Sequence, residues 1–93
     1  MVTGCFIFVC DRGFVIAGEA ELHEHLSLFW HLPRSRTIRN WGTLNGLAEL
    51  ANGPLPGTVL DPACERSLPF RSVIDIIHLS PKGEAAWKQS LSR

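Results

Sequence analysis

The sequence predicts an α+β protein: a small, strongly bent antiparallel sheet of about four to five strands, one mid-chain helix and a short C-terminal helix. Three observations lead to this fold class. Short β-branched and aromatic runs fill the first third of the chain and recur near its end. The turns between the early runs are too short for the crossover that parallel strands need. The two helical patterns occur singly rather than alternating with strands.

Residues 5–10 and 14–22 read as the two strands of a hairpin. Gly13 lies between them and can adopt the positive φ of a tight turn. Alternation places Val15 and Ala17 on one face of the second strand, followed on that face by two glutamates. We therefore expect this strand to leave the core partway along.

Residues 26–32 form the expected third strand, which Pro33 ends by removing a backbone donor. A helix then starts at Gly42 or Thr43 and stops at Gly53. Its apolar positions recur at helical spacing, at Leu44, Leu47, Ala48 and Ala51.

Residues 54–69 hold most of the prolines and are expected to be loop, apart from a possible short strand at 58–60. Residues 72–79 predict a final strand. Ser80 then caps a second helix with Pro81 at its first position, and Trp87 anchors that helix. The layout is similar to the start of SH3-like and Sm-like barrels, so we expect a partly open barrel.

Composition favours a single domain over residues 1–93, because the chain is 93 residues long. The formal net charge is zero, which protects weakly against self-association, so a homo-oligomer is expected. Three cysteines without paired spacing predict a reducing cytoplasm. The apolar run at 5–10 is far too short to span a membrane, and no membrane association is expected.

Positive charge in the middle of the chain comes from arginine alone. Arginine suits bidentate contacts with phosphate or carboxylate groups. No polybasic run accompanies these arginines, so duplex nucleic acid is not an expected partner. The candidate ligand-binding residues are Arg34, Arg36, Arg39, Asn40, Trp41 and Thr43.

Two interpretations of this cluster remain open. If a helix begins at Gly42 or Thr43, its free N–H groups form an anion site, the arginines add donors, and Trp41 or Trp30 stacks on a base. In the simpler interpretation Trp41 packs under the helix, Thr43 caps it, and the arginines are solvated. No Walker or dinucleotide glycine pattern is present, and no cofactor is expected.

Other constellations favour structural roles. His23-Glu24-His25, with His31 or His78, contains ligand types for a metal, but a solvated turn is the favoured interpretation. Cys64 is the one plausible reactive thiol, since Cys5 and Cys10 lie in an apolar strand.

Carboxylates complete the list of candidates. Glu19 and Glu21 share a strand face with Glu24 nearby, and we expect a solvated strand end rather than an acid–base pair. Asp75 pairs with an arginine such as Arg39 or Arg71 or, as we favour, points to solvent. No catalytic residue and no metal site are therefore assigned.

Three blocks of the sequence are similar to a family of small bacteriophage and prophage proteins of unassigned function. FVIAGEAEL resembles a "VFAGxLE" strand. RTIRNW with the leucines after it resembles "ARRLWYW…SLSQLA", and VIDIIHLS resembles "AIEIIPVT". The resemblance covers roughly residues 5–90, and the proline-rich segment 54–71 departs from it. It implies a phage accessory protein in the host cytoplasm and supplies no catalytic residues.

Two functional hypotheses follow. The first is a non-enzymatic counter-defence protein, a homo-oligomer that binds a small anionic ligand, such as a nucleotide signal, through the arginine cluster. The second is a protein–protein interaction module that blocks or recruits a host protein. It would use an exposed edge strand or the surface of Phe29 and Trp30, with Phe29 and Trp87 as the residues whose change abolishes activity.

Overall fold

The computed structural model describes residues 2–22 and 28–92 of the chain. Strands β1 (Val2–Cys10) and β2 (Val15–Leu22) pair antiparallel through the turn η1 (Asp11–Gly13). Arg12 and Gly13 both have positive φ, at 61° and 82°. The predicted hairpin and the role of Gly13 in its turn are confirmed.

The third strand differs from the prediction, because β3 (Phe29–Asn40) runs straight through Pro33. The register of β3 shifts near this residue on both sides, between Glu19 and Glu21 of β2 and between Leu32 and Ser35 against β5. A proline is tolerated in a strand at such a bulge, where no ladder hydrogen bond needs its missing N–H. The arginines expected in a loop therefore lie on a strand.

The prediction of four to five strands was wrong, because the sheet has six. The segment expected to be loop holds β4 (Val59–Leu60) and β5 (Cys64–Pro69). Its prolines fall before, between and at the end of these strands and so do not interrupt either one. Strand β4 confirms the possible short strand at 58–60, and β6 (Val73–His78) confirms the last strand.

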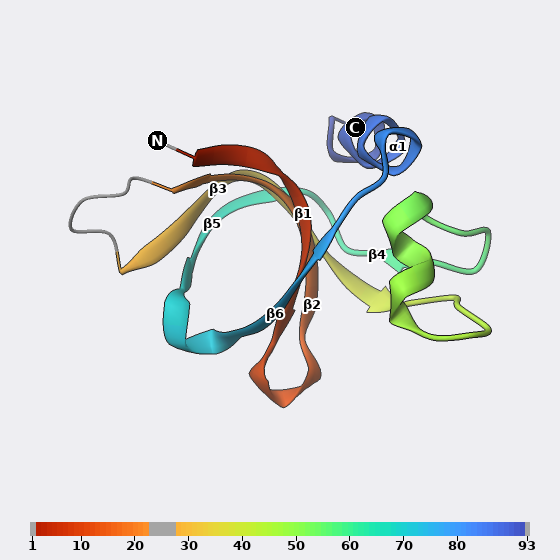
Figure 1. Ribbon diagram of the computed structural model, residues 1–93, viewed down its shortest axis with the longest axis horizontal. Coiled ribbons are helices and arrows are strands. Elements are labelled where there is room, and N and C mark those ends of the chain that lie inside the picture. The colour runs from red at the N-terminus through yellow and green to blue at the C-terminus, as the bar shows by residue number, and fades with distance from the viewer. Residues whose placement is uncertain (1, 23–27, 93) are drawn as a thin grey trace.

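The sheet bends back on itself, as Figure 1 shows. All its pairings are antiparallel, in the order β4-β3-β2-β1-β6, and β5 also pairs with β3. A short corner, η3 (Phe70–Ser72), joins β5 to β6. The segment from β5 to β6 therefore pairs first with β3 and then with β1, at opposite edges of the β3-β2-β1 sheet.

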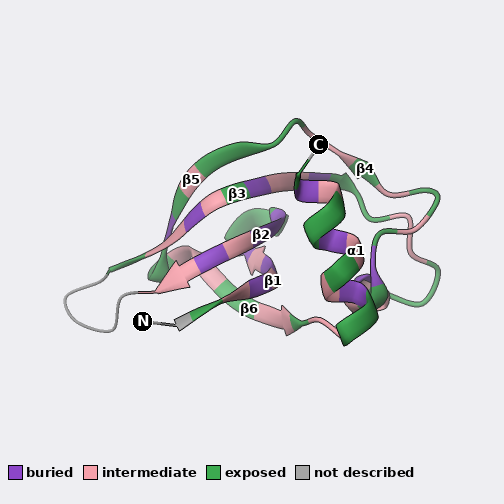
Figure 2. Cartoon of the chain, turned by 90° about the horizontal axis from the view of Figure 1, so that it is seen from above, coloured by how far each residue is buried: buried purple, intermediate pink, exposed green. Residues whose placement is uncertain are grey.

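Both faces of this bent sheet are buried, in two separate cores. Figure 2 marks buried residues in purple on the strands and on α1. We call the core that includes residues of α1 the helix-side core, and the core that lies between the curled strands the inner core. Alternation along β2 splits its residues between them, as the sequence predicts. The inner core consists of Phe8, Cys10, Ile16, Ala20, Leu32 and Leu68. The helix-side core consists of Cys5, Ile7, Val15, Ala17, Ile38, Leu50, Trp87 and Leu91.

The mid-chain helix is shorter and tighter than predicted. It is a 3-10 helix, η2 (Leu47–Asn52), preceded by Gly46 with φ of 115°, a conformation that ends any helix starting further upstream. Leu44, taken as the first core position of the helix, is 94% exposed. Leu50, which was not part of that pattern, is instead the buried residue of η2.

The C-terminal helix α1 (Pro81–Leu91) agrees with the prediction. The Ser80 hydroxyl accepts a hydrogen bond from the Gly83 N–H at 3.0 Å, which caps the helix. Trp87 is fully buried and donates from Nε1 to the Leu50 carbonyl at 2.8 Å, so it anchors α1 to η2. No helix of the described residues is both long enough and apolar enough to cross a membrane.

Gly83 allows α1 and η2 to approach closely. A Cβ at this position would collide with the carbonyl oxygen of Ala51. At a solvent-exposed position in the interior of a helix, Gly→Ala raises the free energy of unfolding by about 1 kcal/mol. We expect Gly83→Ala instead to lower the free energy of unfolding by about 1–3 kcal/mol, measured by urea denaturation, because the two segments must separate. Gln89→Ala, on the exposed side of α1, is the control, and an unchanged or raised stability of Gly83→Ala would contradict this account.

Candidate functional site

The residues predicted to bind an anion lie on the second half of β3 and in the loop after it. Four of them meet: Arg39, Asn40, Trp41 and Thr43, with Gly42, line a shallow hollow of about 320 Å³. The other two, Arg34 and Arg36, do not line it. The structure therefore divides the predicted cluster.

Arg36 acts as a tether between β3 and α1. Its Nε donates to the Asp61 carbonyl at 2.7 Å, and its Nη1 donates to the Ser90 carbonyl at 3.2 Å. Ser90 lies in the last turn of α1, where carbonyl groups lack partners within the helix and the helix dipole favours a cation. This guanidinium therefore holds the end of the helix against the sheet.

Arg39 is largely exposed and is paired with Asp61. Its Nε and its Nη2 each lie 2.8 Å from Oδ1 of that carboxylate. This pairing neutralises the one arginine in the Arg39–Thr43 hollow. Trp41 is 40% exposed and lies beside it, so the hollow keeps an aromatic surface.

Backbone N–H groups in the loop after β3 are also hydrogen-bonded. The Glu49 carboxylate accepts hydrogen bonds from the N–H groups of Asn45, at 2.6 Å, and Leu44, at 3.3 Å. The prediction that an α-helix begins at Gly42 or Thr43 was wrong, and with it the proposed helix N-terminus. The N–H groups of Leu44 and Asn45, just after the hollow, instead bind the carboxylate of Glu49.

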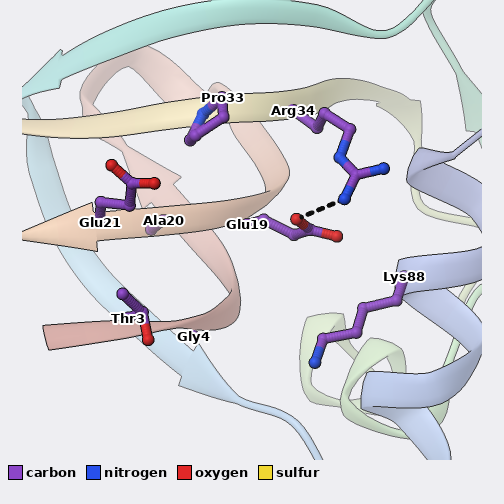
Figure 3. Close-up of a pocket in the computed structure, with 8 residues that line it drawn as sticks. All are labelled: Thr3, Gly4, Glu19, Ala20, Glu21, Pro33, Arg34 and Lys88. Carbon is purple, nitrogen blue, oxygen red and sulfur yellow. Dashed lines mark hydrogen bonds and ion pairs between the residues drawn. The ribbon is translucent and has the colours of Figure 1, made fainter.

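Arg34 lines a second hollow, of about 390 Å³, between β2 and the C-terminal half of α1 (Figure 3). Its Nη2 lies 3.0 Å from Glu19 Oε2, and Lys88 Nζ lies 2.8 Å from Glu84 Oε1. Here the face of β2 passes from apolar to acidic, as the sequence predicts. Each cation of this hollow already has a carboxylate of its own.

His31 bridges two carboxylates on neighbouring strands. Its Nε2 lies 2.9 Å from Glu65 of β5, and its Nδ1 lies 3.3 Å from Glu21 of β2. Hydrogen bonding to Glu65 and then to Glu21 raises the pKa of His31 above its ordinary value. Glu19 and Glu21 were expected at a solvated strand end, but both are partly buried and paired, Glu19 with Arg34 and Glu21 with His31.

Two of the three cysteines are buried, and the third is exposed. Burial, followed by nearby Glu19, raises the pKa of Cys5 to about 11, and burial also raises the pKa of Cys10. Cys64 is exposed on β5, and Arg66 Nη2 lies 2.9 Å from its Sγ. No histidine is hydrogen-bonded to any of these thiols among the described side chains.

No group of side chains among residues 2–22 and 28–92 has the composition and placement of a metal site. The histidines considered as ligands, His23 and His25, and their neighbour Glu24 lie outside the described residues. Asp75 is exposed, in agreement with the favoured expectation. It forms no ion pair with any described side chain.

A third hollow, of about 390 Å³, lies where β5 turns into β6, and its lining residues are apolar apart from Asp75. The Trp30 and Phe70 rings meet there edge-on, with their centroids 5.9 Å apart. Ile74 is 69% exposed beside them, and Leu28, whose carbonyl accepts from the Phe70 N–H at 3.1 Å, is also exposed. We call this the apolar hollow; its lining is Trp30, Phe70, Val73, Ile74, Asp75 and Ile76.

The sequence only partly indicates this surface. Phe29 and Trp30 were considered as a contact surface, and the structure leaves Phe29 half-exposed while Trp30 lines the apolar hollow. Trp87, named with Phe29 as a contact residue, is fully buried and cannot meet a partner. Phe70 was missed because the pairing of β5 with β3, which brings it next to Trp30, was not expected. Ile74 lies in a strand that was predicted, but nothing in the sequence pattern marks it as exposed.

The His31 bridge makes stability depend on pH. A histidine whose pKa is raised on folding stabilises the native state at pH values below its unfolded pKa, and this stabilisation disappears as pH rises through the folded pKa. We expect the urea midpoint to fall as pH rises from about 6 through the raised pKa. His31→Gln should remove this dependence, and His78→Gln, which has no described ion-pair partner, should keep it. A pH dependence that survives in His31→Gln would contradict the assignment.

No family model, no curated protein and no solved structure matches this chain. The geometry of its own residues is therefore the basis for a functional assignment.

Proposed function

We propose that this protein is a non-enzymatic binding module that contacts a partner protein through the apolar hollow. The observation that carries the proposal is the exposure of Ile74 and Leu28 around the half-covered rings of Trp30 and Phe70. Clustered apolar exposure of this kind on a small soluble domain marks an interaction site. Aromatic side chains are the commonest anchors of such contacts.

The topology adds support by analogy. A three-stranded antiparallel sheet is closed by a segment that pairs with both of its edges through a 3-10 corner. We propose that this is a partly open barrel of the SH3-like or Sm-like kind. SH3 domains bind peptides in an aromatic-lined groove. In this chain aromatic residues lie at the 3-10 corner and at the start of β3.

The partner we propose is a host protein in the cytoplasm of a bacterium. The sequence resemblance to small phage proteins supports this choice, and it makes counter-defence the proposed role. What supports a non-enzymatic role is that each charged side chain lining the two polar hollows is paired with an oppositely charged side chain, within the hollow or beside it. Such paired groups supply neither a free nucleophile nor a free base.

Two exposed aliphatic residues at different places on the molecule provide a matched test. We expect Ile74→Ser to reduce retention of a host protein from bacterial lysate at least tenfold, because burying an isoleucine contributes about 1.5–3 kcal/mol. Leu44→Ser changes an exposed leucine that does not line the apolar hollow and should retain the partner. Quantitative mass spectrometry of the captured proteins measures both. Equal retention by the two variants would rule out the apolar hollow as the contact.

Binding of an anionic ligand is the second candidate function. The observation that favours it is the Arg39–Thr43 hollow, in which Trp41 offers a surface for stacking and the Arg39 side chain is mostly exposed. Base stacking on an aromatic side chain is worth about 1–3 kcal/mol. Asp61 and Glu49 weigh against it, because both place negative charge beside the hollow.

Calorimetric titration with cyclic and linear nucleotides tests this candidate. If the Arg39–Thr43 hollow binds a nucleotide, Trp41→Ala should weaken binding by about tenfold or more, since the stacking surface is lost. Arg34→Gln should leave the affinity unchanged, because Arg34 lies outside this hollow. Protein concentrations on the order of 100 µM exceed the dissociation constants expected of a signal-binding protein. An absence of heat at these concentrations would exclude nucleotide binding.

A further inference from the structure

The apolar hollow runs along one edge of β6 rather than over one face of the sheet. Its lining includes four consecutive residues of that strand, from Val73 to Ile76. Successive side chains of a strand point to opposite faces. A hollow that contacts all four must therefore lie beside the strand, next to its main chain. Ile74 is the extra residue of a bulge, since Cys10 pairs with Val73 and Val9 with Asp75.

That edge of β6 is open. Within the described chain β6 pairs with β1 alone, and residues 74–78 make no other main-chain hydrogen bond. Proteins usually blunt such edges with charges, prolines or bulges. Of the other two terminal strands, β4 is only two residues long, and β5 carries Glu65 and Arg66 and ends on Pro69. β6 has a bulge and one charge, Asp75, and places an exposed isoleucine at the bulge.

We infer that the partner supplies an extended segment that adds to the open edge of β6 as a further strand, with an apolar side chain seated in the apolar hollow against Trp30 and Phe70. This inference rests on the proposed function and names the form of the partner. Main-chain hydrogen bonds provide affinity in strand addition, and pockets for alternate side chains provide specificity.

Charge further defines the segment. Asp75 is part of the lining, is exposed, and has no ion-pair partner among the described side chains. A lysine or arginine flanking the apolar anchor would meet this carboxylate. The partner segment is thus extended, apolar at alternate positions, and basic between them.

A blocked synthetic peptide, acetyl-Lys-Ile-Lys-Phe-Thr-Ile-Lys-amide, is the probe. Its titration into the whole protein is followed by calorimetry and by amide hydrogen exchange. We expect a dissociation constant below about 1 mM, and at saturation at least tenfold slower exchange of two or more amides between Ile74 and His78. Ile74→Ser should weaken binding at least tenfold, whereas Leu44→Ser should leave it unchanged.

Two N-methylated peptides separate strand addition from simple burial of side chains. Methylation of one alternate set of amides should abolish binding, and methylation of the other set should have less than a twofold effect, because alternate N–H groups point to opposite edges of a strand. Equal binding of both methylated peptides, or unchanged exchange in β6, would overturn strand addition and leave the proposed function standing.

Three further outcomes of these experiments distinguish a failure of strand addition from a failure of the proposed function. Failure of the peptide to bind, while Ile74→Ser still loses its host partner, overturns strand addition alone. Peptide binding that Ile74→Ser does not affect overturns strand addition at β6, because the peptide then binds elsewhere, and the proposed function is still decided by whether Ile74→Ser retains the host protein. Self-association of the free protein that Ile74→Ser abolishes, without peptide binding, assigns the edge to a second copy of the chain and overturns the peptide partner.

Discussion

The structure depends on one constraint: the central sheet of β1, β2 and β3 carries large apolar residues on both faces. A sheet of this kind cannot leave either face in water, since each buried aliphatic side chain contributes about 1.5–3 kcal/mol relative to exposure. The chain meets the constraint in two ways. On one face it places α1 and η2, anchored by Trp87. On the other it curls the sheet around the inner core. The apolar hollow lies at the corner made by this curl.

Local patterns predict the elements whose stabilising contacts are close in sequence. The hairpin around Gly13 and the capped start of α1 at Ser80 and Pro81 belong to this group. The patterns fail where a distant segment decides. Pro33 ends a strand in isolation, but bulges against β2 and β5 accommodate it. Leu44 fits a helical repeat, but Gly46 prevents the helix from reaching it. The number of strands was underestimated for the same reason, because β5 is a strand only through its pairing with β3.

Distant segments also decide which charged groups of the candidate site are paired, and the sequence does not show this. The sequence correctly identifies an arginine-rich segment, and residue types alone favour an anionic ligand. It does not reveal that Glu19, Asp61 and the carbonyl of Ser90 bind these arginines, since each lies far along the chain from its partner. The arginines of the cluster are consequently paired with groups of the chain itself. The apolar hollow depends equally on distant contacts, because Trp30 and Phe70 meet only through the pairing of β3 with β5.

Closure of the sheet by the last strand also determines when the molecule can fold during synthesis. β1 leaves the ribosome well before β6, yet its second half pairs with β6. Until β6 emerges, the Cys5–Cys10 run has an unpaired edge with high β-propensity and no charge, the combination that favours aggregation. Pairings between such distant segments also slow folding, because the loop-closure entropy is lost before the contacts form. A nascent chain of this protein is therefore most vulnerable in the interval between the appearance of its first strand and its last.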